Sequence, residues 1–129
     1  MQLSFVNDID EFIAKYGFNE QPFDVDKLAF RLDLLNEELD ETELAADESN
    51  PEEIVDGLID LIYIAVGTLR LAGVDAQKAW DEVHRANMSK IRGIKPGREQ
   101  SGGFDVYKPA DWVAPNHNGN HGVLPTIFN

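Results

Sequence analysis

Hydrophobic positions recur at steps of three and four residues along the first two-thirds of the chain. Such spacing is typical of amphipathic helices rather than strands. Residues 5–16 predict a first helix, which Gly17 ends. Residues 25–47 predict a longer second helix, and its expected packing stripe consists of Leu28, Leu32, Leu35 and Leu39.

The segment 52–72 is the most apolar part of the chain. Asn50 followed by Pro51 predicts the start of a helix, because asparagine caps helix N-termini and proline is tolerated at the first helical position. A helix that is apolar all round should be central in a bundle or lie at an oligomer interface. Gly73 ends this helix, and Asp75 is the expected cap of a fourth, over roughly 76–92.

The composition changes at Gly93, because the last 37 residues hold six of the ten glycines and four of the six prolines. No segment alternates convincingly between apolar and polar residues, so the prediction is an all-α protein. We expect a four-to-five-helix bundle over residues 1–92. An extended Gly/Pro-rich C-terminal tail, 93–129, should pack on the same domain or on a neighbouring subunit.

Composition narrows the possible functions. The 129 residues include no cysteine, which excludes disulfides, thiolate zinc sites and cysteine nucleophiles. The N-terminus does not have the pattern of a secretion signal and no apolar run is long enough for a membrane span, so a cytoplasmic protein is expected. The net charge of −13 argues against nucleic-acid and membrane partners. Eighteen of the 24 acids lie in residues 1–60, and five of the 11 basic residues lie between Arg85 and Arg98.

A first group of acids closes the second predicted helix. Glu37 and Glu41 lie one turn apart, with Glu38 beside them. Phe30 and Leu34 continue the same strip toward the N-terminus. The strip thus changes from apolar to acidic along the helix. Such a surface suits a ligand that has a flat ring at one end and phosphates at the other, with a metal ion joining the phosphates to the carboxylates. The alternative is that these acids are ordinary solvated side chains.

A second group lies on the third predicted helix, where Glu53, Asp56 and Asp60 share one face. Glu53 has a second explanation, because a glutamate at the third helical position completes a capping box. Asp60 lies among apolar residues, where an unpaired carboxylate is costly, so it needs a cation, a donor or a metal. An ion pair with Arg70, Arg31 or Arg85 is the alternative to a metal. A site made only of carboxylate oxygens selects Mg²⁺ or Mn²⁺.

The spacing Glu37-Glu38-x-x-Glu41, followed by Glu53-x-x-Asp56, resembles that of the MazG-like all-α nucleoside triphosphate pyrophosphohydrolases. Asp60 and the segments WDEVHRANMSKI and GGFDVYKPADWVAP are similar to its phosphoribosyl-ATP pyrophosphohydrolase-like branch. The resemblance covers about residues 24–114. It implies cleavage of a nucleotide at the α–β phosphoanhydride, giving a monophosphate and pyrophosphate. It also implies Mg²⁺ or Mn²⁺ as the cofactor, and a homodimer or homotetramer.

Carried onto this chain, the resemblance makes Glu37, Glu38, Glu41, Glu53 and Asp56 metal ligands, with Asp60 as an added ligand or a supporting partner. Glu38 is the favoured general base, and Asn87 and Lys90 lie in the segment that contacts the nucleotide. The predicted substrate-binding residues are Phe30, Leu34, Asn87, Lys90, Arg92, Lys95 and Arg98. Alternatively, Asn87 is a core amide and the basic residues form a solvated helix end.

Three functions fit these patterns. The leading one is a (d)NTP pyrophosphohydrolase, and the second is a true phosphoribosyl-ATP pyrophosphohydrolase. The third is a non-enzymatic acidic interaction protein that mimics DNA. The position of the acids beside a core stripe argues against the mimic, which needs carboxylates spread over its surface.

Overall fold

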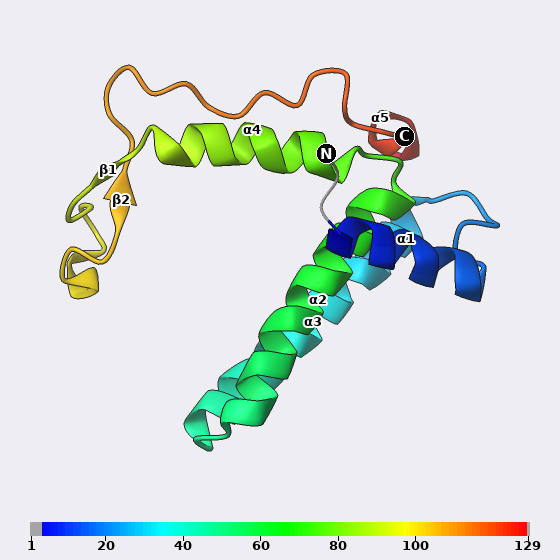
Figure 1. Ribbon diagram of the computed structural model, residues 1–129, viewed down its shortest axis with the longest axis horizontal. Coiled ribbons are helices and arrows are strands. Elements are labelled where there is room, and N and C mark those ends of the chain that lie inside the picture. The colour runs from blue at the N-terminus through cyan, green and yellow to red at the C-terminus, as the bar shows by residue number, and fades with distance from the viewer. Residues whose placement is uncertain (1–3, 129) are drawn as a thin grey trace. The chain divides into compact units, whose positions relative to one another are not determined.

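A computed structural model (Figure 1) describes residues 4–128 and confirms the all-α prediction. The helices are α1 (Ser4–Tyr16), α2 (Val25–Asp47), α3 (Pro51–Leu71), α4 (Ala76–Met88) and α5 (Leu124–Ile127). The other elements are β1 (Ile91–Arg92), η1 (Glu99–Ser101) and β2 (Val106–Tyr107). The sequence did not predict the strands, each of which has only two residues.

The chain forms two compact units. The first comprises the residues up to Gln77 together with those from Gly119 onward, and the second comprises Lys78–Asn118. No single helix of the described part is long and apolar enough to span a membrane, although α3 and α4 taken as a bent pair pass the same test of length and composition.

The first unit is built on α2 and α3, which lie side by side and antiparallel (Figure 1). Asp24 caps α2 by accepting a hydrogen bond from the backbone N–H of Lys27 at 2.8 Å. Asn50 caps α3 in the same way, accepting from the N–H of Glu53 at 3.2 Å, as predicted from the Asn50–Pro51 pair. Only three residues separate the two helices, so α3 must return along α2.

The predicted packing stripe of α2 is wrong in part. Leu32 is 49 % exposed and Leu39 is 45 % exposed. The side of α2 that meets α3 instead carries Arg31, Glu38 and the buried Thr42. Both the leucine stripe and the neighbouring stripe with Thr42 could pack against α3. The stripe with Thr42 does so, because α2 and α3 approach most closely at Thr42.

Gly57 sets that close approach. A Cβ at this position would overlap Oγ1 of Thr42 and would lie 3.1 Å from the Thr42 Cβ. The Thr42 hydroxyl is already engaged, because it donates to the backbone carbonyl of Glu38 at 2.7 Å. The small residue therefore lets α2 and α3 pack closely at the level of Glu38.

Helix α1 packs on α3 through its buried face of Val6, Ile9 and Ile13. A two-point ion pair joins the same helices, with Arg70 Nε and Nη2 donating to the carboxylate of Asp10 at 2.8 and 3.0 Å. Such fork-shaped pairs fix orientation as well as adding energy.

The C-terminal stretch returns to the first unit. The buried Asn120 side chain accepts from the N–H of Asp75 at 2.8 Å and donates to its carbonyl at 2.9 Å. The N–H of Val123 donates to the carbonyl of Ala72 at 2.8 Å. Gly122, at φ +56°, lies so close that a Cβ there would overlap the Ala72 carbonyl oxygen.

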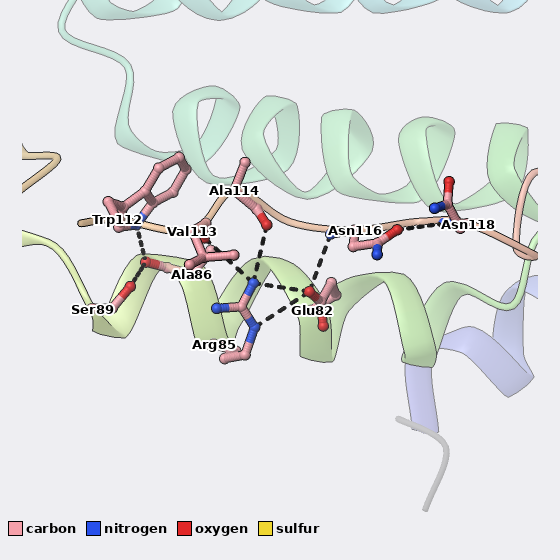
Figure 2. Close-up of polar contacts among 9 residues, drawn as sticks. All are labelled: Glu82, Arg85, Ala86, Ser89, Trp112, Val113, Ala114, Asn116 and Asn118. Atoms are coloured by element: carbon pink, nitrogen blue, oxygen red, sulfur yellow. Dashed lines mark hydrogen bonds and ion pairs between the residues drawn. The ribbon is translucent and has the colours of Figure 1, made fainter. Parts of the chain in front are cut away.

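The second unit contains most of α4, which ends at Met88 and not near 92 as predicted, because Ile91 and Arg92 pair with β2 instead. Its tail is held along α4 by polar contacts (Figure 2). The Trp112 indole donates to the carbonyl of Ala86 at 2.8 Å, and Glu82 accepts from the N–H of Asn116 at 3.1 Å. Arg85 links α4 to this tail, because it pairs with Glu82 of α4 at 2.9 Å and donates to the carbonyl of Ala114 in the tail at 3.2 Å.

Candidate active site

Carboxylates from α2 and α3 meet around Glu38 in the first unit. The Glu38 side chain is half-buried, and this burial is the main cause that raises its pKa. The negative charges of Asp60, Glu41, Asp56 and Glu37 raise the pKa of Glu38 further, in that order. Five of the six predicted metal ligands therefore share one electrostatic environment.

Glu53 stands apart from this group, because it does not contribute to the raised pKa of Glu38. It occupies the first turn of α3, where its backbone N–H donates to the capping Asn50. Its carboxylate is exposed. Only the Asn50 half of the predicted capping box forms, because the N–H of Asn50 donates to the Ala45 carbonyl at 2.9 Å and not to the Glu53 carboxylate.

None of the three arginines considered from the sequence neutralises Asp60. Arg31 donates to the Thr68 hydroxyl and the Ile64 carbonyl, Arg70 pairs with Asp10, and Arg85 pairs with Glu82. Within residues 4–128, no ion pair involves any of the six predicted metal ligands. No basic side chain of the described residues therefore neutralises the charge of this group.

The acids are near one another but do not form a ready-made cage. Among the residues that the structure describes, no group of three or more His, Cys, Asp or Glu side chains is gathered closely enough to hold a metal ion. Exposed carboxylates such as Glu37 and Glu41 have rotamer freedom. The donor set suits a hard divalent cation, because every candidate ligand atom is a carboxylate oxygen.

A cavity of about 880 Å³ lies along the same helical pair, toward the N-terminal half of α2. The predicted substrate-binding residues Phe30 and Leu34 both line it. The remaining walls come from α1, the connection that follows α1, and the second half of α3. Its volume is within the range of small-ligand sites.

Aromatic rings form much of the cavity wall. The ring of Phe12 meets the ring of Tyr63 edge-on at a centroid distance of 5.4 Å, and it meets Phe18 in the same manner at 5.9 Å. The sequence interpretation assigned no functional role to the segment that carries Phe12 and Phe18. Their relation to Tyr63 depends on how α1 packs on α3, so no local pattern could have identified it.

Arg31 also lines the cavity, which the sequence did not predict, because the sequence suggested only an ion pair between Arg31 and Asp60. A signal was available, however, because Arg31 precedes Leu35 by one turn, Glu38 by two turns and Thr42 by three on a single side of α2. An arginine in a helix seam is unusual and indicates a specific interaction.

The predicted nucleotide contacts that follow residue 86 all lie in the second unit. Asn87 is exposed, so it is not a core amide. The Lys90 ammonium lies 5.5 Å from the centre of the Trp112 ring, and Lys95 is partly buried. Arg92 donates to the Gly103 carbonyl at 3.1 Å, and Arg98 forms an ion pair with Asp105, with Nη2 to Oδ1 at 3.0 Å.

The first unit therefore combines an aromatic cavity with an unneutralised group of acids. A cavity of this kind accepts a flat ring, and carboxylates bind phosphates only through cations between them. A family model described as phosphoribosyl-ATP pyrophosphohydrolase matches residues 10–87, which include the acids, most of α4 and every residue that lines the cavity except Ile9. No curated protein matches the chain.

Proposed function

The chain belongs to the phosphoribosyl-ATP pyrophosphohydrolase family, and from that premise we propose that it hydrolyses a nucleoside triphosphate with Mg²⁺ or Mn²⁺ held by acids of α2 and α3. Its enzyme class follows from the family, whose members are pyrophosphohydrolases that act on phosphoanhydride bonds. This class decides against the non-enzymatic DNA mimic. The proposed products are a nucleoside monophosphate and pyrophosphate.

The observation that carries the proposal is the environment of Glu38. Burial raises the pKa of its side chain most, four neighbouring carboxylates raise that pKa further, and no ion pair of the described residues neutralises these carboxylates. Like charges gathered without a counter-charge destabilise a fold, so a divalent cation would be favoured there.

We assign the cation to Glu37, Glu38, Glu41, Asp56 and Asp60, with Glu53 at the edge of the group. A bound Mg²⁺ or Mn²⁺ would neutralise phosphate charge and lower the pKa of a coordinated water. Glu38 is the proposed general base, because its half-buried carboxylate lies among the acids of both helices. A cation beside Glu38 would bring its pKa down again and keep it ready to accept a proton at neutral pH.

Phe30 and Leu34 are the proposed contacts of the base, since both line the aromatic cavity. Asn87, Lys90, Arg92 and Lys95 remain the proposed polar contacts to the nucleotide. Arg98 would have to release Asp105 to bind a phosphate, so it is the weakest member of this set.

We also propose that the protein works as a homodimer or homotetramer. Helix α3 leaves Val55, Leu58, Ile59 and Ile62 half exposed or more, on one stripe at steps of three and four residues. Leu39 of α2 is exposed to a similar degree. Apolar surface of this extent on long helices is typical of a face that another subunit covers. Light scattering of the purified chain would test this, and a monomer at micromolar concentration would refute it.

Phosphoribosyl-ATP is the second candidate substrate, and it is compatible with the family match. A panel of the common NTPs and dNTPs, dUTP and phosphoribosyl-ATP, scored for pyrophosphate release with Mg²⁺ and with Mn²⁺, separates the two candidates. Activity on phosphoribosyl-ATP alone would refute the broader nucleotide assignment.

Metal binding is tested by titrating Mn²⁺ into the apo-protein and recording thermal stability. We expect stoichiometric stabilisation that is lost in Glu38→Gln and Asp56→Asn. Glu43→Gln is the matched control, because Glu43 is an exposed acid of α2 that does not contribute to the raised pKa of Glu38. Equal Mn²⁺ stabilisation in all three variants would exclude the proposed site.

A further inference from the structure

Three cations line the aromatic cavity of the first unit, and two of them are already neutralised. Lys27 pairs with Asp24 at 3.1 Å, and Arg70 pairs with Asp10. Within the described part of the chain, Arg31 has no carboxylate partner. Burial lowers the pKa of its guanidinium, yet arginine keeps its proton in proteins, so the cavity wall carries a positive charge that forms no ion pair, although the acid Glu20 also lines the cavity.

The guanidinium of Arg31 is held in a defined position. Its Nε donates to the Thr68 hydroxyl at 3.1 Å, and its Nη2 donates to the Ile64 carbonyl at 3.0 Å. The Thr68 hydroxyl in turn donates to the same carbonyl at 2.7 Å. These bonds use two of the five N–H groups of an arginine, and three remain for a ligand.

Gly67 makes room for this arrangement. A Cβ at position 67 would lie 2.6 Å from Nη2 of Arg31. Glycine is unfavourable in the interior of a helix, yet here it lies within α3 and is buried. The backbone of α3 thus forms a cradle for the guanidinium.

The cavity and the acids are neighbours on the same two helices. Leu34 lines the cavity and precedes Glu38 by one turn of α2. Tyr63 and Ile64 line the cavity and follow Asp60 by about one turn of α3. One helical turn rises about 5.4 Å, so a nucleotide whose phosphates lie at the acids can place its base in the cavity.

We propose that Arg31 reads the base of the nucleotide and that the preferred base is guanine. This inference rests on the proposed function and extends it to the choice of substrate. The free groups of Arg31 are all donors, and guanine presents two adjacent acceptors, O6 and N7, which arginine binds in a fork. Adenine places an amino donor beside N7 and would face the guanidinium with a donor.

The pyrimidines fit this site less well. Uracil and thymine carry an N–H between their two carbonyl groups, so they offer no adjacent pair of acceptors. Cytosine has such a pair in O2 and N3, but its single ring fills less of a cavity of about 880 Å³ lined by several aromatic residues. A two-ring base makes more contact with the rings of Phe12, Phe30 and Tyr63.

The test compares kcat/KM for dGTP, dATP, dCTP, dUTP and 7-deaza-dGTP, in which carbon replaces N7. In the wild-type protein we expect dGTP to be favoured over dATP and over 7-deaza-dGTP by about tenfold or more. Both ratios should fall to near one in Arg31→Met. Arg31→Lys should keep the charge but lose most of the discrimination, because an ammonium has no fork.

Lys15→Met is the matched control, since Lys15 is an exposed cation of α1 outside the cavity. It should leave both ratios unchanged. The inference is overturned if the wild type prefers another base, or if the ratio of dGTP to 7-deaza-dGTP survives in Arg31→Met. Should Arg31→Met fail to fold, the wild-type ratio and the Arg31→Lys variant decide the question.

Binding of dGMP and dAMP, measured calorimetrically, keeps the inference separate from catalysis. We expect dGMP to bind about tenfold more tightly. Pyrophosphate release from several nucleotides without a guanine preference would refute the role of Arg31 and leave the proposed function standing. Tight dGMP binding without hydrolysis of any nucleotide would refute the proposed function and support the base site.

Discussion

Replacing Gly57 with alanine tests how closely α2 and α3 must pack at the acids. The new Cβ would overlap Oγ1 of Thr42, and rotating the hydroxyl away would still leave the two Cβ atoms 3.1 Å apart. The helices must therefore separate or shift, next to Glu38 and Asp56.

Two opposing effects determine the expected change in stability. Alanine is favoured over glycine inside a helix by about 1 kcal/mol. Overpacking of a tight contact costs about 1–3 kcal/mol. Because the contact involves Cβ atoms attached directly to the two backbones, we expect overpacking to win by roughly 1 kcal/mol, which lowers the thermal midpoint by roughly 3–6 °C for a chain of this size.

The assay is thermal and urea unfolding of the Gly57→Ala and Thr42→Gly variants and of their combination. Thr42→Gly removes both Oγ1 and the Cβ, so it makes room for the alanine. We expect a favourable coupling of about 1 kcal/mol or more between the two substitutions. If Gly57→Ala raises the midpoint, or if the two effects simply add, the close contact does not control the packing of α2 on α3.

Three further predictions concern the acids, a cap and the C-terminal stretch. Because the pKa of Glu38 is raised above its ordinary value of 4.5, the apo-fold loses stability as pH rises through the folded pKa. Glu38→Gln should therefore be more stable than the wild type at neutral pH, by at most about 1 kcal/mol for a partly exposed group, and not at pH 4. Asp24 has a lowered pKa, chiefly from the backbone hydrogen bond of Lys27, so Asp24→Ala should lower the midpoint at pH 7, with the difference vanishing as pH falls through the folded pKa. Gly122→Ala should cost about 1–3 kcal/mol in urea unfolding, because its Cβ would overlap the Ala72 carbonyl oxygen, and unchanged stability would refute that contact.

Local sequence signals identified the helices well. The caps at Asp24 and Asn50 accept hydrogen bonds from backbone N–H groups three residues away, so nearby positions in the sequence are enough to predict them. The end of α4 was missed for the converse reason. Residues 91–92 pair with residues 106–107, and the sequence near residue 91 does not show which distant segment it pairs with.

The side of α2 that meets α3 could not be chosen from the sequence. Leucines at 28, 32, 35 and 39 make one plausible stripe, but an adjacent stripe that shares Leu35 also carries Arg31, Glu38 and Thr42. The choice depends on Gly57 of the facing helix, which admits Thr42 closely. A hydrophobic pattern on one helix contains no information about a small residue on its neighbour.

By itself, the sequence determined the helical class, the limits of the long helices, and the presence of two acid groups at helical spacing, because each depends on residues within a few turns of one another. Only the tertiary structure decided that Glu38 lies among the acids of both helices, that no arginine pairs with Asp60 within residues 4–128, and that Arg31 faces an aromatic cavity built partly by α1. These facts depend on which side chains from distant segments share a space, and close packing between helices, not the pattern within one, determines that.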